Sequence, residues 1–327
     1  MATGNCPGCG ANPCELFYEL ASVPTNNRWL SPSRDQAVAL PRGDIALKFC
    51  QGCGLVFNGV FDPNLIDGTG FHEERDEDSP VFEAFQRRLA DQLIERYALV
   101  CSKNLLQSVP ESTQCLELLR RILHKDARLF LQVSNFMRTL KNIAFWDINY
   151  PSCSYFTPGT LYRLLRAQSF AVSDVWTDFD AEYLMADARV AARGNTDSSP
   201  SENIETIADL ADLVARFAHE SRERQAMWCE ILRKLAGGGN RIAIWGAGSR
   251  TASFLTTLAV GDEVSYVVDM NPGRQGKFTP GTGHRIVAPD VMVSMRPDVV
   301  IVMNSVVAFE IRDLLAQAGC APTLLIA

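Results

Sequence analysis

Residues 241–250 read Arg-Ile-Ala-Ile-Trp-Gly-Ala-Gly-Ser-Arg, an apolar run that enters a glycine-containing turn. The apolar residues before Gly246 predict a buried strand, and the segment after Gly248 has the spacing of a helix. Glycines at such a turn permit a tight bend and let a phosphate approach the helix N-terminus. Glycines at this place also occur where a helix simply packs closely on a strand and no ligand is bound. Nucleotide binding and plain packing therefore both stay open.

Outward from this turn, the segment 240–327 alternates apolar strands with helical patterns, which predicts a small parallel α/β unit. Asp269 ends the second strand, 21 residues after Gly248. That spacing is near the one at which an acid binds a ribose in dinucleotide-binding folds. Thr251 stands where the dinucleotide fingerprint has its third glycine, so the pattern is incomplete.

The rest of the chain divides at polar segments. Residues 193–200 (Arg-Gly-Asn-Thr-Asp-Ser-Ser-Pro) predict a linker, and a long amphipathic helix follows to about Leu235. Another helix begins at Ser79-Pro80 and runs to about Tyr97. We expect four segments, with boundaries at 1–78, 79–193, 194–239 and 240–327.

Four of the ten cysteines form two Cys-x-x-Cys pairs, Cys6 with Cys9 and Cys50 with Cys53. A two-residue spacer lets a turn aim two thiolates at one ion, and two such turns supply the four ligands of a tetrahedral zinc site. The 40 residues between the pairs are more than a compact zinc ribbon uses. We predict one structural zinc ion, with unrelated redox or core pairs as the alternative.

Charge and hydropathy exclude several classes of protein. The chain has 31 Lys and Arg against 38 Asp and Glu, a net charge of −7, which offers no global attraction to nucleic acid or to an anionic membrane. No apolar run approaches the ~18–20 residues that span a bilayer. The N-terminus lacks the basic and apolar regions of a secretory signal. We expect a cytoplasmic protein with no nucleic acid or membrane partner.

A known family resembles the C-terminal part. Residues 269–282 read Asp-Met-Asn-Pro-Gly-Arg-Gln-Gly-Lys-Phe-Thr-Pro-Gly-Thr. With the glycine turn before them and Arg296-Pro297-Asp298 after them, they resemble the C-terminal domain of the SAM-dependent sugar C-methyltransferases. These enzymes build branched deoxysugars on nucleotide carriers. The resemblance implies an α/β chain with an N-terminal zinc-knuckle domain, a central class I methyltransferase Rossmann domain and a C-terminal Rossmann-like domain.

The resemblance also implies a ligand, a nucleotide-linked and for example dTDP-linked sugar. Arg274 and Lys277 are expected to bind its diphosphate, and Pro280 and Gly281 to shape the loop. The alternative is that the loop only packs against a neighbouring domain. The full set of predicted substrate-binding residues is Gly246, Gly248, Asp269, Asn271, Arg274, Lys277, Pro280, Gly281 and Thr282.

The central segment departs from the family at its catalytic motifs. Before Ser-Tyr-Phe the family has a Tyr-Glu-His motif that supplies the general base; here Tyr150 is kept as the catalytic candidate, but Pro151 and Ser152 replace Glu and His. A serine hydroxyl cannot take up a proton at neutral pH as an imidazole does. Upstream, Gln107 and Ser108 stand where the family has Glu and His.

The SAM-binding half of the central domain is not found. Between Cys53 and Arg241 no glycine-rich SAM-binding turn occurs, and the run 98–101 already resembles the fourth strand of the family's domain. Residues 98–193 number 96, whereas a complete domain needs roughly 180. We predict a truncated half domain with an open strand edge, through either a genuine deletion or a reading-frame artefact.

Three functions follow from these patterns. The first is a SAM-dependent C-methyltransferase acting on a nucleotide-linked deoxysugar, and the second is a catalytically silent relative that binds zinc and the nucleotide-sugar. The third is an NAD-linked oxidoreductase, which rests on fold analogy alone, because no Tyr-Lys or His constellation accompanies the turn. We predict a family member whose methyl transfer is impaired or absent.

Overall fold

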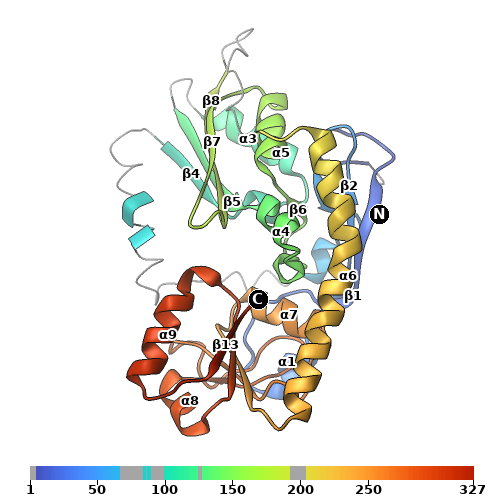
Figure 1. Ribbon diagram of the computed structural model, residues 1–327. Helices are drawn as coiled ribbons and strands as arrows, with labels where there is room; N and C mark the ends of the chain where they lie inside the picture. The colour runs from blue at the N-terminus through green and yellow to red at the C-terminus, as the bar shows by residue number, and fades with distance from the viewer. Residues whose placement is uncertain (1–4, 67–83, 86, 90–98, 124–126, 192–203) are drawn as a thin grey trace.

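The computed structural model describes residues 5–66, 84–85, 87–89, 99–123, 127–191 and 204–327 (Figure 1). These residues form three sheets covered by helices, so the predicted α/β class is confirmed. The helix predicted from Ser79 is described only at residues 84–85 and 87–89, and its other residues lie outside the described part. Within the part of the chain that is described, no helix is long and apolar enough to cross a membrane.

The N-terminal sheet is antiparallel, with strand order β1-β2-β3-β6. Its strands are β1 (Glu15–Pro24), β2 (Arg42–Phe49), β3 (Val56–Asn58) and β6 (Ser154–Tyr155), with α1 (Arg34–Val38) and the 3₁₀ turn η1 (Pro63–Leu65) beside them. Because β6 comes from far along the chain and pairs with β3, this sheet joins the N-terminal and central segments.

The central sheet has the order β4-β5-β8-β7, with β4 parallel to β5 and the other pairs antiparallel. The sheet and its helices are β4 (Leu99–Lys103), α3 (Ser112–Ile122), β5 (Arg128–Ser134), α5 (Pro158–Ala167), β7 (Phe170–Asp178) and β8 (Tyr183–Val190). Within the described residues β4 pairs only with β5, so its other edge is open there.

Short elements that no periodicity predicted connect β5 to β6. They are the helix α4 (Phe136–Asn142) and the 3₁₀ turn η4 (Phe145–Asp147); a further 3₁₀ turn, η3 (Leu106–Ser108), follows β4. Asn135 caps α4, because its side-chain oxygen accepts from the N–H of Met137. The apolar residues of α4 and η4 enter the main core, which places η4 against the C-terminal unit.

The C-terminal sheet is wholly parallel, with the order β11-β10-β9-β12-β13, as predicted for this unit. It contains β9 (Ile242–Trp245), α7 (Ser249–Thr257), β10 (Tyr266–Val268), β11 (Ile286–Val287), α8 (Pro289–Met295), β12 (Val299–Val302), the 3₁₀ turn η5 (Ser305–Val307), α9 (Ala308–Gln317) and β13 (Thr323–Ile326). From β9 the chain first adds strands on one side (β10, β11) and then on the other (β12, β13), so the strand order reverses between β9 and β12. Open α/β sheets bind ligands at such a position.

The helix α6 (Ile207–Gly237) runs along one side of the molecule, from the central unit down to the C-terminal unit (Figure 1). It begins with a capping box between Thr206 and Asp209. In its first half Phe217 packs edge-on against Tyr18, and in its second half Trp228 packs edge-on against Phe254. The helix thus contributes to a core that is shared by the N-terminal and C-terminal sheets, whereas the central sheet has a core of its own.

Candidate functional site

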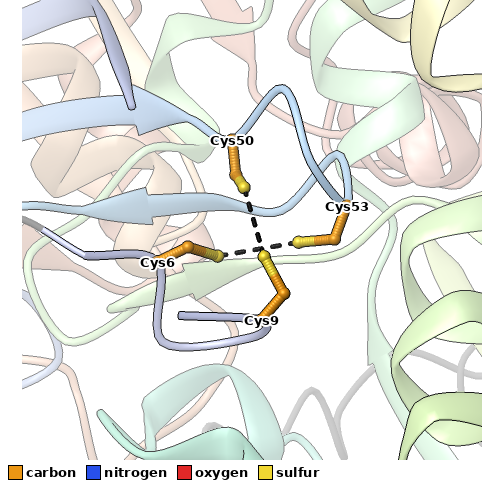
Figure 2. A group of neighbouring side chains, drawn as sticks. All are labelled: Cys6, Cys9, Cys50 and Cys53. Carbon is orange, nitrogen blue, oxygen red and sulfur yellow. Dashed lines mark hydrogen bonds between the residues drawn. The ribbon is translucent and has the colours of Figure 1, made fainter. Parts of the chain in front are cut away.

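The four predicted metal ligands converge in space (Figure 2). The sulfurs of Cys6, Cys9, Cys50 and Cys53 all lie within 4.8 Å of one another, and the pairs Cys6–Cys53 and Cys9–Cys50 are 3.6 Å apart. A tetrahedral ion about 2.3 Å from each sulfur separates the sulfurs by about 3.8 Å. The four cysteines can therefore bind a metal ion, and the 40-residue spacing between the pairs is no obstacle.

The surroundings of this cluster favour a thiolate at Cys6 and disfavour one at Cys9 and Cys53. The hydrogen bond with Cys53, against the effect of burial, lowers the pKa of Cys6 to about 5, whereas the same bond raises the pKa of Cys53 and burial raises the pKa of Cys9. The backbone N–H of Gly8 also points to the Cys6 sulfur, at 3.3 Å. Outside the cluster, Arg163 of α5 donates through Nε to the Cys53 carbonyl at 3.0 Å. The contact of Arg163 ties the second cysteine turn to the central unit.

A cavity of about 280 Å³ lies between the central unit and the C-terminal sheet. From the C-terminal unit it is lined by the turn after β9, by α9 and by residues that follow β10 and β12. From the central unit it is lined by α4, η4, the loop before β6 and the β7–β8 turn. Five predicted ligand-binding residues line it: Gly246, Gly248, Asp269, Asn271 and Arg274.

Asp269, whose spacing from the glycine turn resembles that of a ribose-binding acid, instead closes the glycine turn. Gly246 has a φ of 96°, a conformation that favours glycine. Asp269 accepts from the N–H of Ala247 at 2.7 Å through Oδ2 and from the N–H of Asn271 at 2.8 Å through Oδ1. Arg274 reaches the same carboxylate at 3.1 Å. Asp269 therefore organises two loops of the cavity wall.

The remaining loop residues lie elsewhere. Lys277 is exposed, and Lys277, Pro280, Gly281 and Thr282 are not among the residues that line the cavity. Gly281 donates to the Ala37 carbonyl at 2.9 Å, and its own carbonyl accepts from Arg42 at 3.0 Å. The later half of the loop thus packs on the N-terminal unit, and its contact with a ligand stays a prediction.

Two of the altered catalytic positions, Gln107 and Ser152, face the cavity, whereas Ser108 and Pro151 are not among the residues that line it. Ser152 donates to Asn149 at 3.2 Å, and Gln107 exchanges hydrogen bonds with the side chain and backbone of Ser134. The four residues of these hydrogen bonds line the cavity, where they form a wall of neutral amides and hydroxyls. None of the described residues that line the cavity is a histidine.

Tyr150, the catalytic candidate, lies outside this cavity. It is 1% exposed and stacks on Phe61, with ring centroids 5.4 Å apart. Its hydroxyl accepts from the N–H of Asp62 at 3.0 Å and lies 3.3 Å from the Asp62 carbonyl. Burial raises its pKa. In this arrangement Tyr150 fastens the loop after β3, while Tyr155 is the tyrosine of that stretch that lines the cavity.

Charged residues that sequence reasoning missed meet at one side of the cavity. Arg250 of α7 binds Asp147 of η4 and Glu182 of the β7–β8 turn, and Arg138 of α4 lies within 4 Å of both acids. These residues are spread over more than a hundred positions of sequence. The one available signal was Arg250 itself, which directly follows the glycine turn.

The comparisons relate this chain to one class of protein. Residues 196–321, from α6 to α9, match the family described as the C-methyltransferase C-terminal domain. C-methyltransferase NovU of Streptomyces niveus is 24% identical to the chain over 240 residues, which are 70% of this chain and 57% of that relative. The chain therefore spans little more than half the length of the relative that it matches.

A solved structure shares far less. The T. thermophilus 16S rRNA N2 G1207 methyltransferase, in complex with AdoMet and guanosine, covers 64% of this chain and 55% of its own. Its TM-score is 0.20 at 11% identity, which is too little to define a common fold.

Proposed function

We propose that this chain is a sugar C-methyltransferase relative that binds a nucleotide-linked deoxysugar and transfers methyl groups poorly or not at all. The observation that carries the proposal is the cavity, which joins the glycine turn and Arg274 of the C-terminal unit to two of the altered catalytic positions of the central unit. The match of residues 196–321 supports the same assignment.

The cavity has the chemistry for such a ligand. The first turn of α7 and the Arg274 guanidinium, which Asp269 holds at 3.1 Å, suit a diphosphate, because backbone N–H groups at a helix start and a planar cation both bind phosphate oxygens. Opposite them, the amides and hydroxyls of the central unit suit sugar hydroxyls.

The positions that carry the family's catalytic Glu and His offer no base for proton abstraction in this chain. The positions of the family's Glu and His hold Gln107, Pro151 and Ser152 in this chain. The nearby carboxylates of Asp147 and Glu182 both bind the Arg250 guanidinium at 2.6 Å, so each is already engaged in an ion pair.

The described residues also do not fit SAM. SAM would supply the methyl group, but the glycine-rich turn and ribose-binding acid that class I methyltransferases use are not found between Cys53 and the C-terminal unit. The β4 edge, unpaired among the described residues, lies where strands of that half would continue the sheet. We derive no methyl-transfer step for this chain.

We also propose that the ion held by the four cysteines is zinc with a structural role. All four ligands are sulfur, and no position is left for a substrate or water once an ion has four thiolates. The NAD-linked alternative is not favoured, because the carboxylate expected to bind a ribose is engaged by Ala247 and Asn271.

Isothermal calorimetry on the zinc-loaded chain tests the function. We expect saturable binding of a dTDP-linked deoxysugar and no heat from SAM at physiological concentrations, with or without the sugar. Micromolar SAM binding, or methyl incorporation from labelled SAM, would restore the enzyme interpretation. Absence of binding by dTDP-sugars and UDP-sugars up to millimolar concentration would reject the ligand.

A further inference from the structure

Arg250 connects the C-terminal unit to the central unit. It lies in the first turn of α7, and its side chain is 23% exposed. Its Nε donates to Asp147 at 2.6 Å, and its Nη1 donates to Glu182 at 2.6 Å. One guanidinium therefore bridges two carboxylates that come from different loops of the central unit. A planar cation with fixed donors makes such a double contact, which an ammonium cannot reproduce.

The two carboxylates are held rigidly from their own side. Arg138 lies 3.8 Å from Asp147 and 3.7 Å from Glu182, and Thr139 donates to Asp147 at 3.3 Å. The backbone carbonyl of Glu182 accepts from the N–H of Asn135, the residue that caps α4. The four charged residues thus form a neutral, closed group. Burial alone would lower the pKa of Arg250, but its two carboxylates outweigh this and raise it.

The bridge lies between the two halves of the cavity. On one side Arg250 comes two residues after Gly248 of the glycine turn. On the other side Asp147 comes five residues before Ser152, and Glu182 lines the cavity itself. Next to the bridge, Phe254 of α7 packs on Phe145 and Trp146 of η4, with ring centroids 6.0 and 6.1 Å apart. Apolar contacts and the charged bridge therefore join the two units side by side.

We propose that Arg250 is a positioning residue: it aligns the glycine turn with the amide and hydroxyl wall so that one ligand can contact both units. The guanidinium of Arg250 is bound to Asp147 and Glu182. Its effect on a ligand is therefore exerted through these two carboxylates. The part of this inference that concerns the ligand rests on the proposed function, whereas the alignment of the units does not.

The first test needs no ligand. Arg250→Met keeps the length and apolar stem of the side chain and removes the bridge, so Phe254 should still pack and the chain should fold. We expect its melting temperature to fall by roughly 5 °C and hydrogen exchange to rise in both α7 and η4. Arg121→Met, a change to an exposed arginine of α3, is the matched control and should move neither. Unchanged exchange in α7 and η4 would overturn the inference.

A double-mutant cycle separates the bridge from general destabilisation. If Arg250 acts through Asp147, the destabilisation in Arg250→Met/Asp147→Asn should be smaller than the sum of the two single effects. Arg250→Lys should recover part of the loss, because an ammonium can satisfy one carboxylate at a time. Additive effects, or no recovery by lysine, would contradict the proposed bridge.

The ligand test compares two probes. If alignment matters, Arg250→Met should bind a dTDP-sugar about tenfold more weakly, the size of a typical coupling between sites. Its affinity for dTDP alone, which needs the C-terminal half only, should change little. Equal losses for both probes would show that Arg250 contacts the nucleotide directly and would overturn the positioning role. If the wild-type chain binds neither probe, the proposed function fails, while exchange and the cycle still decide the alignment.

Discussion

The carboxylate of Asp269 accepts a hydrogen bond from the backbone N–H of Ala247 at 2.7 Å, so the acid that ends β10 closes the glycine turn that follows β9. The other oxygen of the carboxylate accepts from the N–H of Asn271. In a dinucleotide-binding fold an acid at this place faces a ribose. Here it holds the two loops that form one wall of the cavity.

Asp269→Ala should therefore destabilise the chain by roughly 1–3 kcal/mol, because two backbone donors lose their acceptor in a buried place. Asp269→Asn keeps one acceptor oxygen and should cost less. Asp313→Ala, at an exposed position of α9, is the control. Urea denaturation measures all three, and equal stability of Asp269→Ala and wild type would contradict the role.

Metal content tests the cysteine site. Freshly purified reduced protein should contain about one zinc per chain, and Cys9→Ser should contain far less, since each structural site needs all four thiolates. Cys101→Ser, at an exposed cysteine outside the cluster, should keep full metal content. Chelation should lower the melting temperature of wild type. Protein that is fully folded and free of metal would refute a structural ion.

The two cations of the 271–282 loop differ in their relation to the cavity. Arg274 lines it, whereas Lys277 is exposed and does not. Arg274→Ala should therefore weaken binding of a dTDP-sugar more than Lys277→Ala, and Lys277→Ala should leave the melting temperature unchanged. Titration calorimetry gives both affinities. A larger loss in Lys277→Ala would place the diphosphate outside the described cavity.

Packing of the loop on the N-terminal unit can be measured at Gly281. This residue has a φ of 80°, and a Cβ on it would lie 2.5 Å from Pro24. Gly281→Ala should destabilise by strain and by overlap, roughly 1–3 kcal/mol in all. Gly276 has a φ of 79°, but a Cβ added to it would have no atom within 4 Å. Gly276→Ala therefore measures the backbone strain without the overlap. Similar losses in both variants would exclude tight packing at Pro24.

His284 predicts a pH dependence of stability. Its Nδ1 lies 2.9 Å from the Thr282 hydroxyl and its Nε2 lies 2.9 Å from the Gly261 carbonyl, and burial lowers its pKa. The folded state thus favours neutral imidazole. Its contribution is complete above the unfolded pKa of about 6.5 and is lost as the pH falls below that value. His284→Gln should lose less stability than wild type between pH 7.5 and 5, as measured by urea denaturation. A larger loss in the variant would reverse this assignment.

Local sequence determined the elements and one of the sites. Apolar runs and glycine turns predicted the parallel C-terminal unit, because period and turn chemistry act over a few residues. The two Cys-x-x-Cys pairs predicted that the four cysteines come together, as they do in the structure. The prediction depends on the ligands that a tetrahedral ion needs and not on the number of residues between the pairs.

Only the tertiary structure decided what those elements do together. Arg250, Asp147 and Glu182 are far apart in the sequence, and each one alone has the character of an ordinary surface charge. Their bridge exists because η4 and α7 share an apolar core that brings the three side chains together. For the same reason Gly281 faces the N-terminal unit and not the cavity: a loop motif states which residues are present, but the neighbouring unit decides which way each of them points.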